Sequence, residues 1–312
     1  MPLSEKIVIE RIRRAAGESR RYGVGIGDDC AVLPMPKGHE ALITTDFTLE
    51  DVHFRQAWHP PDSVGHRCLA RGLSDIAAMG GIPRAVFLSL AVPGKLLQGW
   101  IDEFTRGLLL MAGNSGVPLA GGDTAQSPRG IMADIVVLGS VPSGTAVLRS
   151  RSRPGDLLYV TGTLGESVAA LNDLRAGKKL RPKSRPKHFY PQPRLAVGRY
   201  LREKNIATSM IDVSDGLSTD LGHICDESGV GAVVYAETLP HDRKKADLQL
   251  ALHGGEEYEL LFTAAPQRRV PKQISGVPIT LIGEITRNRS MMLAKADGKM
   301  EPLKPGGWQH FG

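Results

Sequence analysis

The chain has 312 residues, which is long for one compact domain and comfortable for two. With 41% hydrophobic and 23% charged residues, it has the composition of an ordinary soluble globular protein. The net charge of +6 fits either a nucleic-acid partner or small substrates that carry several negative charges. The basic residues are scattered, and prolines interrupt the one dense run (residues 181–188), so small anionic substrates are favoured.

Cysteine usage and hydropathy predict a cytoplasmic protein. Cys30, Cys68 and Cys225 lie far apart and form no CxxC pair, which argues against a disulfide framework or a zinc site and for a reducing compartment. The N-terminal segment has no apolar run long enough for a signal peptide, and no other stretch is long enough to span a membrane.

The first half of the chain contains both helical and strand patterns. Apolar residues at helical spacing predict helices over residues 4–16, 62–79 and 95–112. Runs rich in β-branched residues predict strands over residues 41–45 and 133–141.

A charged stretch ending in Pro-Gly, residues 149–155, breaks this pattern and marks the predicted domain boundary. We therefore expect an N-terminal domain over residues 1–148 and a C-terminal domain over residues 149–312. In the second domain we expect strands over 157–161, 209–213, 231–236, 258–263 and 278–284, helices over 166–172 and 217–226, and a long loop over 178–193. Strands and helices mix without strict βαβ alternation, which predicts an α+β fold rather than a doubly wound sheet.

Five segments place aspartate where a hydrophobic element meets glycine, serine or threonine. They are GIGDD (25–29), TTD (44–46), LSD (73–75), GGD (121–123) and IDVSDG (211–216). Any one of them can be a turn or a helix cap, because Asp, Ser, Thr and Gly all favour those places. Aspartate beside core elements is costly unless its charge is compensated. A cluster of oxygen ligands for Mg²⁺ would explain all five.

Familiar nucleotide-binding signatures are absent from the sequence. There is no Walker A sequence, and GVGIGD (23–28) is not the dinucleotide fingerprint, because its third glycine comes too soon. Protein-kinase motifs, the serine-hydrolase elbow and HExxH are also missing. The sequence leaves open a nucleotide held through metal ions rather than in a glycine cradle.

Seven blocks, in this order, resemble the thiamine-monophosphate kinase family. They are GIGDDCAVL (25–33), TTDFTLEDVHF (44–54), LSDIAAMGGIP (73–83), AGGDT (120–124), VTGTLGES (160–167), IDVSDGLSTDLGHI (211–224) and GGEEYELLFT (254–263). Part of this set is shared with the wider aminoimidazole-ribotide synthetase superfamily. The end of the second block and the last block point to the thiamine-phosphate enzymes within it.

The resemblance implies a two-domain α+β fold, in which the N-terminal sheets of two subunits pair into an intersubunit barrel and the C-terminal domain has α/β layers. It implies a homodimer that uses ATP and several Mg²⁺ ions to phosphorylate thiamine monophosphate to thiamine diphosphate. Nucleic acid and membrane are not expected as partners. The N-terminal domain would bind ATP and Mg²⁺ and form the dimer, and the C-terminal domain would complete the nucleotide and substrate site.

Site residues follow from the resemblance, position by position. The implied magnesium ligands are Asp29, Thr44, Thr45, Asp46, Asp75, Asp123, Asp212 and Asp215, of which Asp46, Asp123 and Asp212 are expected to be catalytic. The implied ATP contacts are Gly122, Asp123, Arg149 and Ser214, and His53, Glu257 and Trp308 would border the thiamine phosphate. The sequence departs from the family at Glu257, where Asp is usual, and at Gly72, where Asn is frequent.

The chemistry is consistent with this set. The acceptor is already a phosphate monoester, largely dianionic near neutral pH, so no strong general base is needed and direct in-line transfer is expected. The thiazolium cation suits an anionic Glu257 and a stacking Trp308. Taken singly, His53 would be an ordinary surface histidine, Trp308 a cover over the core and Arg149 a solvated linker charge. The alternative functions are another ATP-dependent synthetase of the superfamily and a basic nucleic-acid-binding protein.

Overall fold

The computed structural model describes residues 5–17 and 35–308. The predicted magnesium ligand Asp29 therefore lies outside the described residues. The chain divides into two compact units. Unit 1 comprises residues 1–76, 82–144 and 189–191, and unit 2 comprises residues 77–81, 145–188 and 192–312. None of the helices in the described ranges is long and apolar enough to cross a bilayer.

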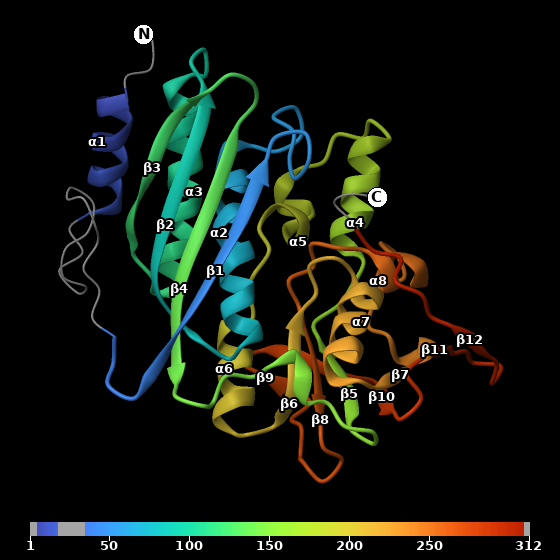
Figure 1. Cartoon of the computed structure of the whole chain (residues 1–312). Helices are drawn as coiled ribbons and strands as arrows, with labels where there is room; N and C mark the ends of the chain where they lie inside the picture. Colours follow the sequence, from blue (N-terminus) through green and yellow to red (C-terminus); the bar gives the residue numbers. More distant parts are fainter. Residues whose placement is uncertain (1–4, 18–34, 309–312) are drawn as a thin grey trace. The chain divides into compact units, whose positions relative to one another are not determined.

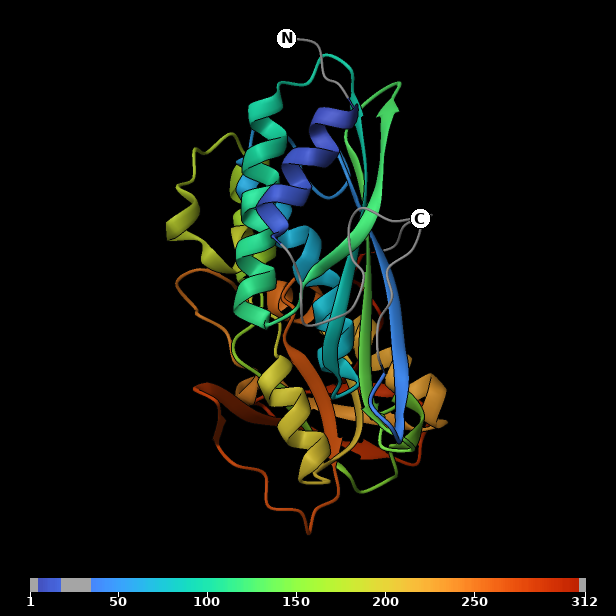
Figure 2. The same ribbon diagram turned by 90° about the vertical axis from the view of Figure 1, so that its left-hand side faces the viewer.

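Unit 1 is built on a four-stranded mixed sheet with the order β1-β4-β2-β3 (Figure 1). The strands are β1 (His39–Leu49), β2 (Ile82–Pro93), β3 (Leu119–Ser127) and β4 (Met132–Pro142). Strands β2 and β3 are parallel, and the other neighbours are antiparallel. Helices α1 (Glu5–Ala16), α2 (Pro61–Ala78) and α3 (Gln98–Ser115) lie on the same side of this sheet, as Figure 2 shows.

The alternation of side chains along β1 separates a covered face from an open face. Leu42 and Thr48 are buried on the side that the helices cover, whereas Ile43, Thr45 and Phe47 are exposed on the other side. Successive residues of a strand point to opposite faces, so residues 44 and 46 share the covered face. The same alternation runs through β4, where residues 133, 135 and 137 are buried.

Unit 2 contains an eight-stranded mixed sheet with the path β12-β11-β7-β10-β5-β8-β6, and β9 pairs with β10 (Figure 1). The strands are β5 (Leu157–Thr161), β6 (Ala207–Asp212), β7 (Gly231–Tyr235), β8 (Leu260–Ala264), β9 (Gln273–Ile274), β10 (Val277–Thr286), β11 (Met291–Ala294) and β12 (Met300–Pro302). The helical segments from residue 149 onward are η1 (Arg149–Arg151), α4 (Glu166–Arg175), η2 (Pro182–Ser184), α5 (Pro186–Phe189), α6 (Leu195–Glu203), α7 (Leu217–Ser228), η3 (Ala236–Thr238) and α8 (Leu248–His253).

Two apolar clusters cover the two faces of the unit 2 sheet. Leu261 of β8 belongs to one cluster with Leu221 of α7. Its neighbour Phe262 belongs to the other cluster with Leu201 of α6. Every residue of β8 is buried, as expected for a strand with helices on both sides. The mixed sheets and the two units confirm the predicted two-domain α+β fold.

The structure confirms the predicted helices and strands and adds others. Strands β2, β3, β9, β11 and β12 and helices α6 and α8 were not predicted. Residues 178–193, expected to form a loop, contain the short helices η2 and α5. Each of these two begins with a proline, whose fixed φ suits the first position of a helix.

Candidate active site

Unit 1 gathers carboxylates around Asp46 on the covered face of its sheet. Thr44 donates a hydrogen bond to Asp75 of α2, and the Arg71 guanidinium lies 3.6 Å from the Asp46 carboxylate. Burial raises the pKa of Asp46 to about 6; Asp75 and Asp134 raise it further, while Arg71 opposes the rise. Because one arginine accompanies two carboxylates on this face, Asp46 and Asp75, the group can accept further positive charge. Thr44, Asp46 and Asp75, all predicted ligands, are thus brought together.

The open face of the same sheet carries Asp123, another predicted residue of unit 1. The register aligns Phe47 with Asp134, Asp134 with Ser89, and Ser89 with Asp123, so these side chains share one face. Asp123 is exposed, and its carboxylate accepts a hydrogen bond from the Thr124 amide at 2.8 Å. Asp134 was not predicted, although its alternation with buried neighbours in β4 could have revealed it.

The sheet therefore separates Asp46 from Asp123. They lie on opposite faces and on the two edge strands β1 and β3, three inter-strand spacings or roughly 14 Å apart. Thr45 shares the open face with Asp123 rather than the covered face with Asp46. Next to Asp123, Gly122 has a φ of 151°, and a Cβ there would lie 1.9 Å from the Leu88 carbonyl oxygen. A glycine is required for β3 to pair this closely with β2.

His53 lies in the turn after β1. Its Nδ1 accepts a hydrogen bond from the Leu49 amide at 3.0 Å, and its own amide donates to the Leu49 carbonyl at 2.9 Å. Arg67 donates to the His53 carbonyl at 3.2 Å. Since Nδ1 is the acceptor, the proton of the neutral ring is on Nε2.

In unit 2 the predicted residues Asp212, Ser214 and Asp215 follow one another at the end of β6, where the chain turns into α7. Asp212 is buried. The Asp220 carboxylate, one turn into α7, accepts hydrogen bonds from the amides of Asp215 at 3.2 Å and Gly216 at 3.0 Å. Burial, together with the charges of Asp212 and Asp215, raises the pKa of Asp220 to about 8.

Asp220 and His223 are functional candidates that sequence analysis missed. Possible ligand atoms of Asp215, Asp220 and His223 all lie within 4.8 Å of one another, close enough to surround one metal ion. Asp220 and His223 are three residues apart on α7, a spacing that places both on one face of a helix. That spacing was visible in the sequence and could have identified them.

Trp308 lies beside this turn. Its amide donates a hydrogen bond to the Asp215 carbonyl at 3.0 Å, and the preceding Gly307 amide donates to the Thr219 hydroxyl at 3.1 Å. The Trp308 side chain is 47% exposed, so it does not serve as a cover over the core. Trp308 therefore lies at the surface, next to Asp215.

Arg149 lies elsewhere in unit 2. Its carbonyl accepts a hydrogen bond from Ser228, the last residue of α7, at 2.7 Å. Ser214 and Asp215 precede the first turn of that helix, which spans 12 residues or roughly 18 Å. The backbone of Arg149 is therefore not adjacent to these two residues, and its exposed side chain is the only part of it that can reach toward them.

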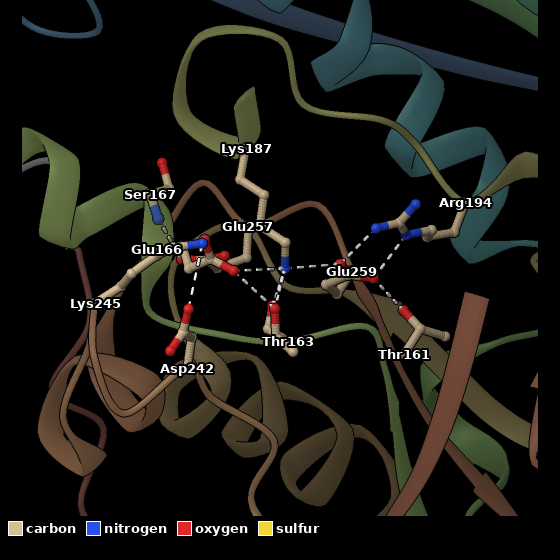
Figure 3. A network of polar contacts seen from close by, with 10 residues as sticks. All are labelled: Thr161, Thr163, Glu166, Ser167, Lys187, Arg194, Asp242, Lys245, Glu257 and Glu259. Carbon is tan, nitrogen blue, oxygen red and sulfur yellow. Dashed lines mark hydrogen bonds and ion pairs between the residues drawn. The ribbon is translucent and has the colours of Figure 1, made fainter. Parts of the chain in front are cut away.

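Glu257 is buried beside the first turn of α4 (Figure 3). One of its carboxylate oxygens, Oε1, accepts a hydrogen bond from the Ser167 amide at 2.9 Å. The other, Oε2, is buried and has no hydrogen-bond partner within the described part of the chain. Burial raises the pKa of Glu257 to about 8; Lys187 opposes this rise, and Glu259 and Glu166 add to it.

Comparison with known proteins identifies the family. The AIR synthase related protein N-terminal domain matches residues 27–141, and the C-terminal domain of the same name matches residues 153–293. The thiamine-monophosphate kinase of Escherichia coli (strain K12) is 36% identical over 304 residues, covering 92% of this chain and 92% of that relative. The chain belongs to the thiamine-monophosphate kinase family.

Solved structures of thiamine-monophosphate kinases share the fold. The enzyme from Stenotrophomonas maltophilia K279a superposes with a TM-score of 0.82 at 33% identity, over 96% of this chain and 98% of that chain. The structure named "AaThiL complexed with AMPPCP and TMP" superposes with a TM-score of 0.79 at 29% identity, over 99% of this chain and 97% of that chain. AMPPCP is a non-hydrolysable analogue of ATP.

Proposed function

We propose that the protein catalyses ATP-dependent phosphorylation of thiamine monophosphate, giving thiamine diphosphate and ADP. The observation that carries this function is 36% identity to a named thiamine-monophosphate kinase over nearly the whole chain. The solved relative whose name includes AMPPCP and TMP supports both substrates. A synthetase of the wider superfamily and a nucleic-acid-binding protein are the less favoured alternatives.

Magnesium is the proposed cofactor, and the described residues fit it. The pKa of Asp46 is raised by burial and by neighbouring carboxylates, as expected for a group of carboxylates that a bound cation would neutralise. Mg²⁺ prefers carboxylate and hydroxyl oxygens. The proposed ligands are Asp29, Thr44, Thr45, Asp46, Asp75, Asp123, Asp212 and Asp215. When bound, the ions would reduce the repulsion between the two phosphate-bearing substrates.

The chain's own residues bind and orient the substrates. We assign ATP contacts to Gly122, Asp123, Arg149 and Ser214, and thiamine-phosphate contacts to His53, Glu257 and Trp308. The exposed indole of Trp308 can stack on a cationic ring. We assign residues 1–148 to ATP and magnesium binding and to dimerisation, and residues 149–312 to completion of the nucleotide and substrate site. The buried free thiols of Cys68 and Cys225 support a cytoplasmic location.

The decisive assay is incubation of the protein with ATP, Mg²⁺ and thiamine monophosphate, followed by chromatographic detection of thiamine diphosphate. We expect the diphosphate and ADP in equal amounts. Free thiamine should not react, because it lacks the phosphate that supplies the attacking oxygen. Absence of thiamine diphosphate, or efficient phosphorylation of free thiamine, would contradict the proposed substrate. A salt-dependent DNA titration tests the nucleic-acid alternative.

Transfer is proposed to be direct and in line, without a phosphoenzyme. No activated nucleophile is evident in the sequence, and the acceptor's phosphate oxygen is itself a competent nucleophile. One displacement inverts the configuration at phosphorus, whereas two would retain it. Chirally labelled γ-thiophosphoryl ATP is expected to give an inverted product. Retention, or radiolabelled protein after incubation with ATP alone, would contradict direct transfer.

A further inference from the structure

Glu259 is a fully buried carboxylate held by two cations and a hydroxyl (Figure 3). Arg194 binds it in a bidentate manner, with Nε to Oε2 at 2.7 Å and Nη2 to Oε1 at 2.6 Å. The Thr161 hydroxyl donates to Oε2 at 2.6 Å, and the Lys187 ammonium lies 3.3 Å from Oε1. Lys187 is itself fixed by the Thr163 hydroxyl at 2.7 Å. Both carboxylate oxygens therefore have partners.

Stability alone is a poor explanation for this cluster. Removing charges from water is costly, and replacing a buried ion pair with well-packed apolar residues is often neutral or stabilising. The Glu259 carboxylate also lies close to Gly162, in the turn after β5. A Cβ on Gly162 would lie 2.1 Å from the Glu259 Oε1. The carboxylate therefore occupies the space that a side chain at residue 162 would need. A role in fixing local geometry accounts for both features.

The backbone attached to Glu259 pairs with the Asp212–Asp215 turn. The Glu259 carbonyl accepts a hydrogen bond from the Val213 amide at 2.8 Å, and the Tyr258 amide donates to the Val213 carbonyl at 2.9 Å. The Glu256 amide donates to the Ser214 carbonyl at 2.7 Å. The segment 254–258 therefore lies directly along the residues that follow Asp212.

The same segment is strained. Glu256 and Tyr258 have φ values of 60° and 52°, in the left-handed region, and Glu257 lies between them. Such a conformation is unfavourable for a residue with a side chain and persists only where the surroundings impose it. Glu259 follows directly, and its four side-chain contacts anchor the end of the segment.

We propose that Glu259, held by Arg194 and Lys187, is a positioning residue that fixes the strained segment 254–258 against the Asp212–Asp215 turn. In this way it sets the orientation of Glu257 and of the carboxylates at the end of β6. In this role the fully buried Glu259 acts only through these neighbours. The inference deepens the proposed function and rests on it.

The kinetic test is Glu259→Gln, which keeps the shape and removes the charge that Arg194 and Lys187 hold. We expect kcat to fall about 10–100-fold and the Mg²⁺ concentration for half-maximal rate to rise, the range typical when a group supporting a metal site is lost. KM for ATP should change less than threefold. Assays are run well below the melting temperature of each variant, so that loss of folded protein does not contribute.

A second measurement is independent of the reaction. Hydrogen exchange followed by NMR is expected to show faster exchange of the Val213, Glu256 and Tyr258 amides in Glu259→Gln, with β10 amides unchanged. The matched control is Lys245→Gln, which breaks the Lys245–Glu166 ion pair at 2.8 Å at the outer side of the same network. This control should keep wild-type rates and exchange.

The outcomes separate the two claims. If wild type forms no thiamine diphosphate, the proposed function fails, and hydrogen exchange alone decides the positioning role. Unchanged exchange in Glu259→Gln, or kcat and Mg²⁺ dependence within twofold of wild type, overturns the positioning role. If Glu259→Gln does not fold, Arg194→Lys decides, because lysine keeps the charge but loses the bidentate contact. A kcat within twofold of wild type for that variant also overturns the inference.

Discussion

Asp46 and Asp212 are the residues on which the proposed metal sites depend most directly. Changing each to Asn keeps the size of the side chain and removes a negative ligand. We expect kcat to fall at least about 100-fold, since loss of one electrostatic contact to a transition state costs about 10²–10³ in rate. Stability should be unchanged or higher, because Asp46 lies near Asp75 and Asp134, and Asp212 near Asp220. Turnover at saturating Mg²⁺ and thermal melting measure the two effects.

The control for this pair is Asp297→Asn, the same change in an exposed residue that pairs with Lys299 on the turn between β11 and β12. It should leave turnover within twofold of wild type. Near-normal turnover in both Asp46→Asn and Asp212→Asn would show that these residues are not metal ligands.

The buried carboxyl of Glu257 predicts how the melting temperature depends on pH. Burial raises the pKa of this carboxyl to about 8, above the ordinary value of 4.5 expected in the unfolded chain. A carboxyl with a raised folded pKa adds stability below the unfolded pKa and loses it as the pH rises through the folded pKa. Between about pH 5 and about pH 9, the melting temperature of wild type should therefore fall relative to Glu257→Gln. Differential scanning calorimetry at several pH values measures this difference.

Glu301→Gln is the matched control, because Glu301 is exposed and forms an ion pair with Lys295 on the surface of β12. Its melting temperature should run parallel to that of wild type. If the curves of Glu257→Gln and wild type also run parallel, Glu257 is charged at neutral pH in the folded protein. That result would favour Glu257 as an anionic partner of a cationic ligand.

At the scale of elements, the local sequence pattern was sufficient to predict the helices and strands that have regular apolar spacing. It failed for β3, whose sequence LAGGDTAQS is rich in residues that favour turns. This strand forms because β2 lies beside it and Gly122 allows the close pairing, which is a tertiary effect. Strand β2 was missed because prolines stand near both ends of its apolar run. Short strands such as β12 carry no pattern of their own.

Two glycines of α3 differ in how closely α2 packs against them. A Cβ on Gly107 would lie 1.9 Å from the carbonyl oxygen of Asp62 in α2, whereas a Cβ on Gly113 meets nothing within 4 Å. Gly107→Ala should therefore destabilise the protein by about 1–3 kcal/mol through overpacking. Gly113→Ala, the matched change on the same helix, should be neutral or stabilise it by up to about 1 kcal/mol. Urea unfolding of both variants gives the two values.

Opposite signs for the two glycine variants would show that α2 and α3 pack as closely as the structure has them. If both variants are stabilised, the close approach of the two helices is wrong. The comparison is robust because helix propensity contributes equally to both changes.

At the scale of the whole molecule, the sequence motifs predicted which residues matter but not how they group. Thr44, Thr45 and Asp46 are adjacent in the chain, yet alternation puts Thr45 on the other face of β1. The row that joins Asp134 to Asp123 depends on the register of strands far apart in sequence. Glu259 was quoted within a motif, but its partner Arg194 immediately precedes a helix that was not predicted. Such non-local contacts leave no local pattern.

Exposed apolar side chains on the open face of the unit 1 sheet predict a homodimer in solution. Ile43 and Phe47 are 70% and 61% exposed on this face, and Met132 is 41% exposed at the start of β4. The edge strand β1 is 11 residues long. Exposed apolar groups on a sheet with long free edges favour pairing with another chain. This supports dimerisation through the N-terminal half, in which two such sheets would pair into a barrel.

Light scattering at micromolar concentration should give the mass of a dimer for wild type. Phe47→Glu should weaken the dimer at least about 30-fold, because a central apolar contact in an interface contributes about 2 kcal/mol or more. The matched control is Leu110→Glu, which changes an apolar residue of α3 that is 58% exposed and lies in a helix rather than on the open face. This variant should remain a dimer. A monomeric mass for wild type contradicts dimerisation, and equal weakening by both variants contradicts its location on the open face, because only Phe47 lies there.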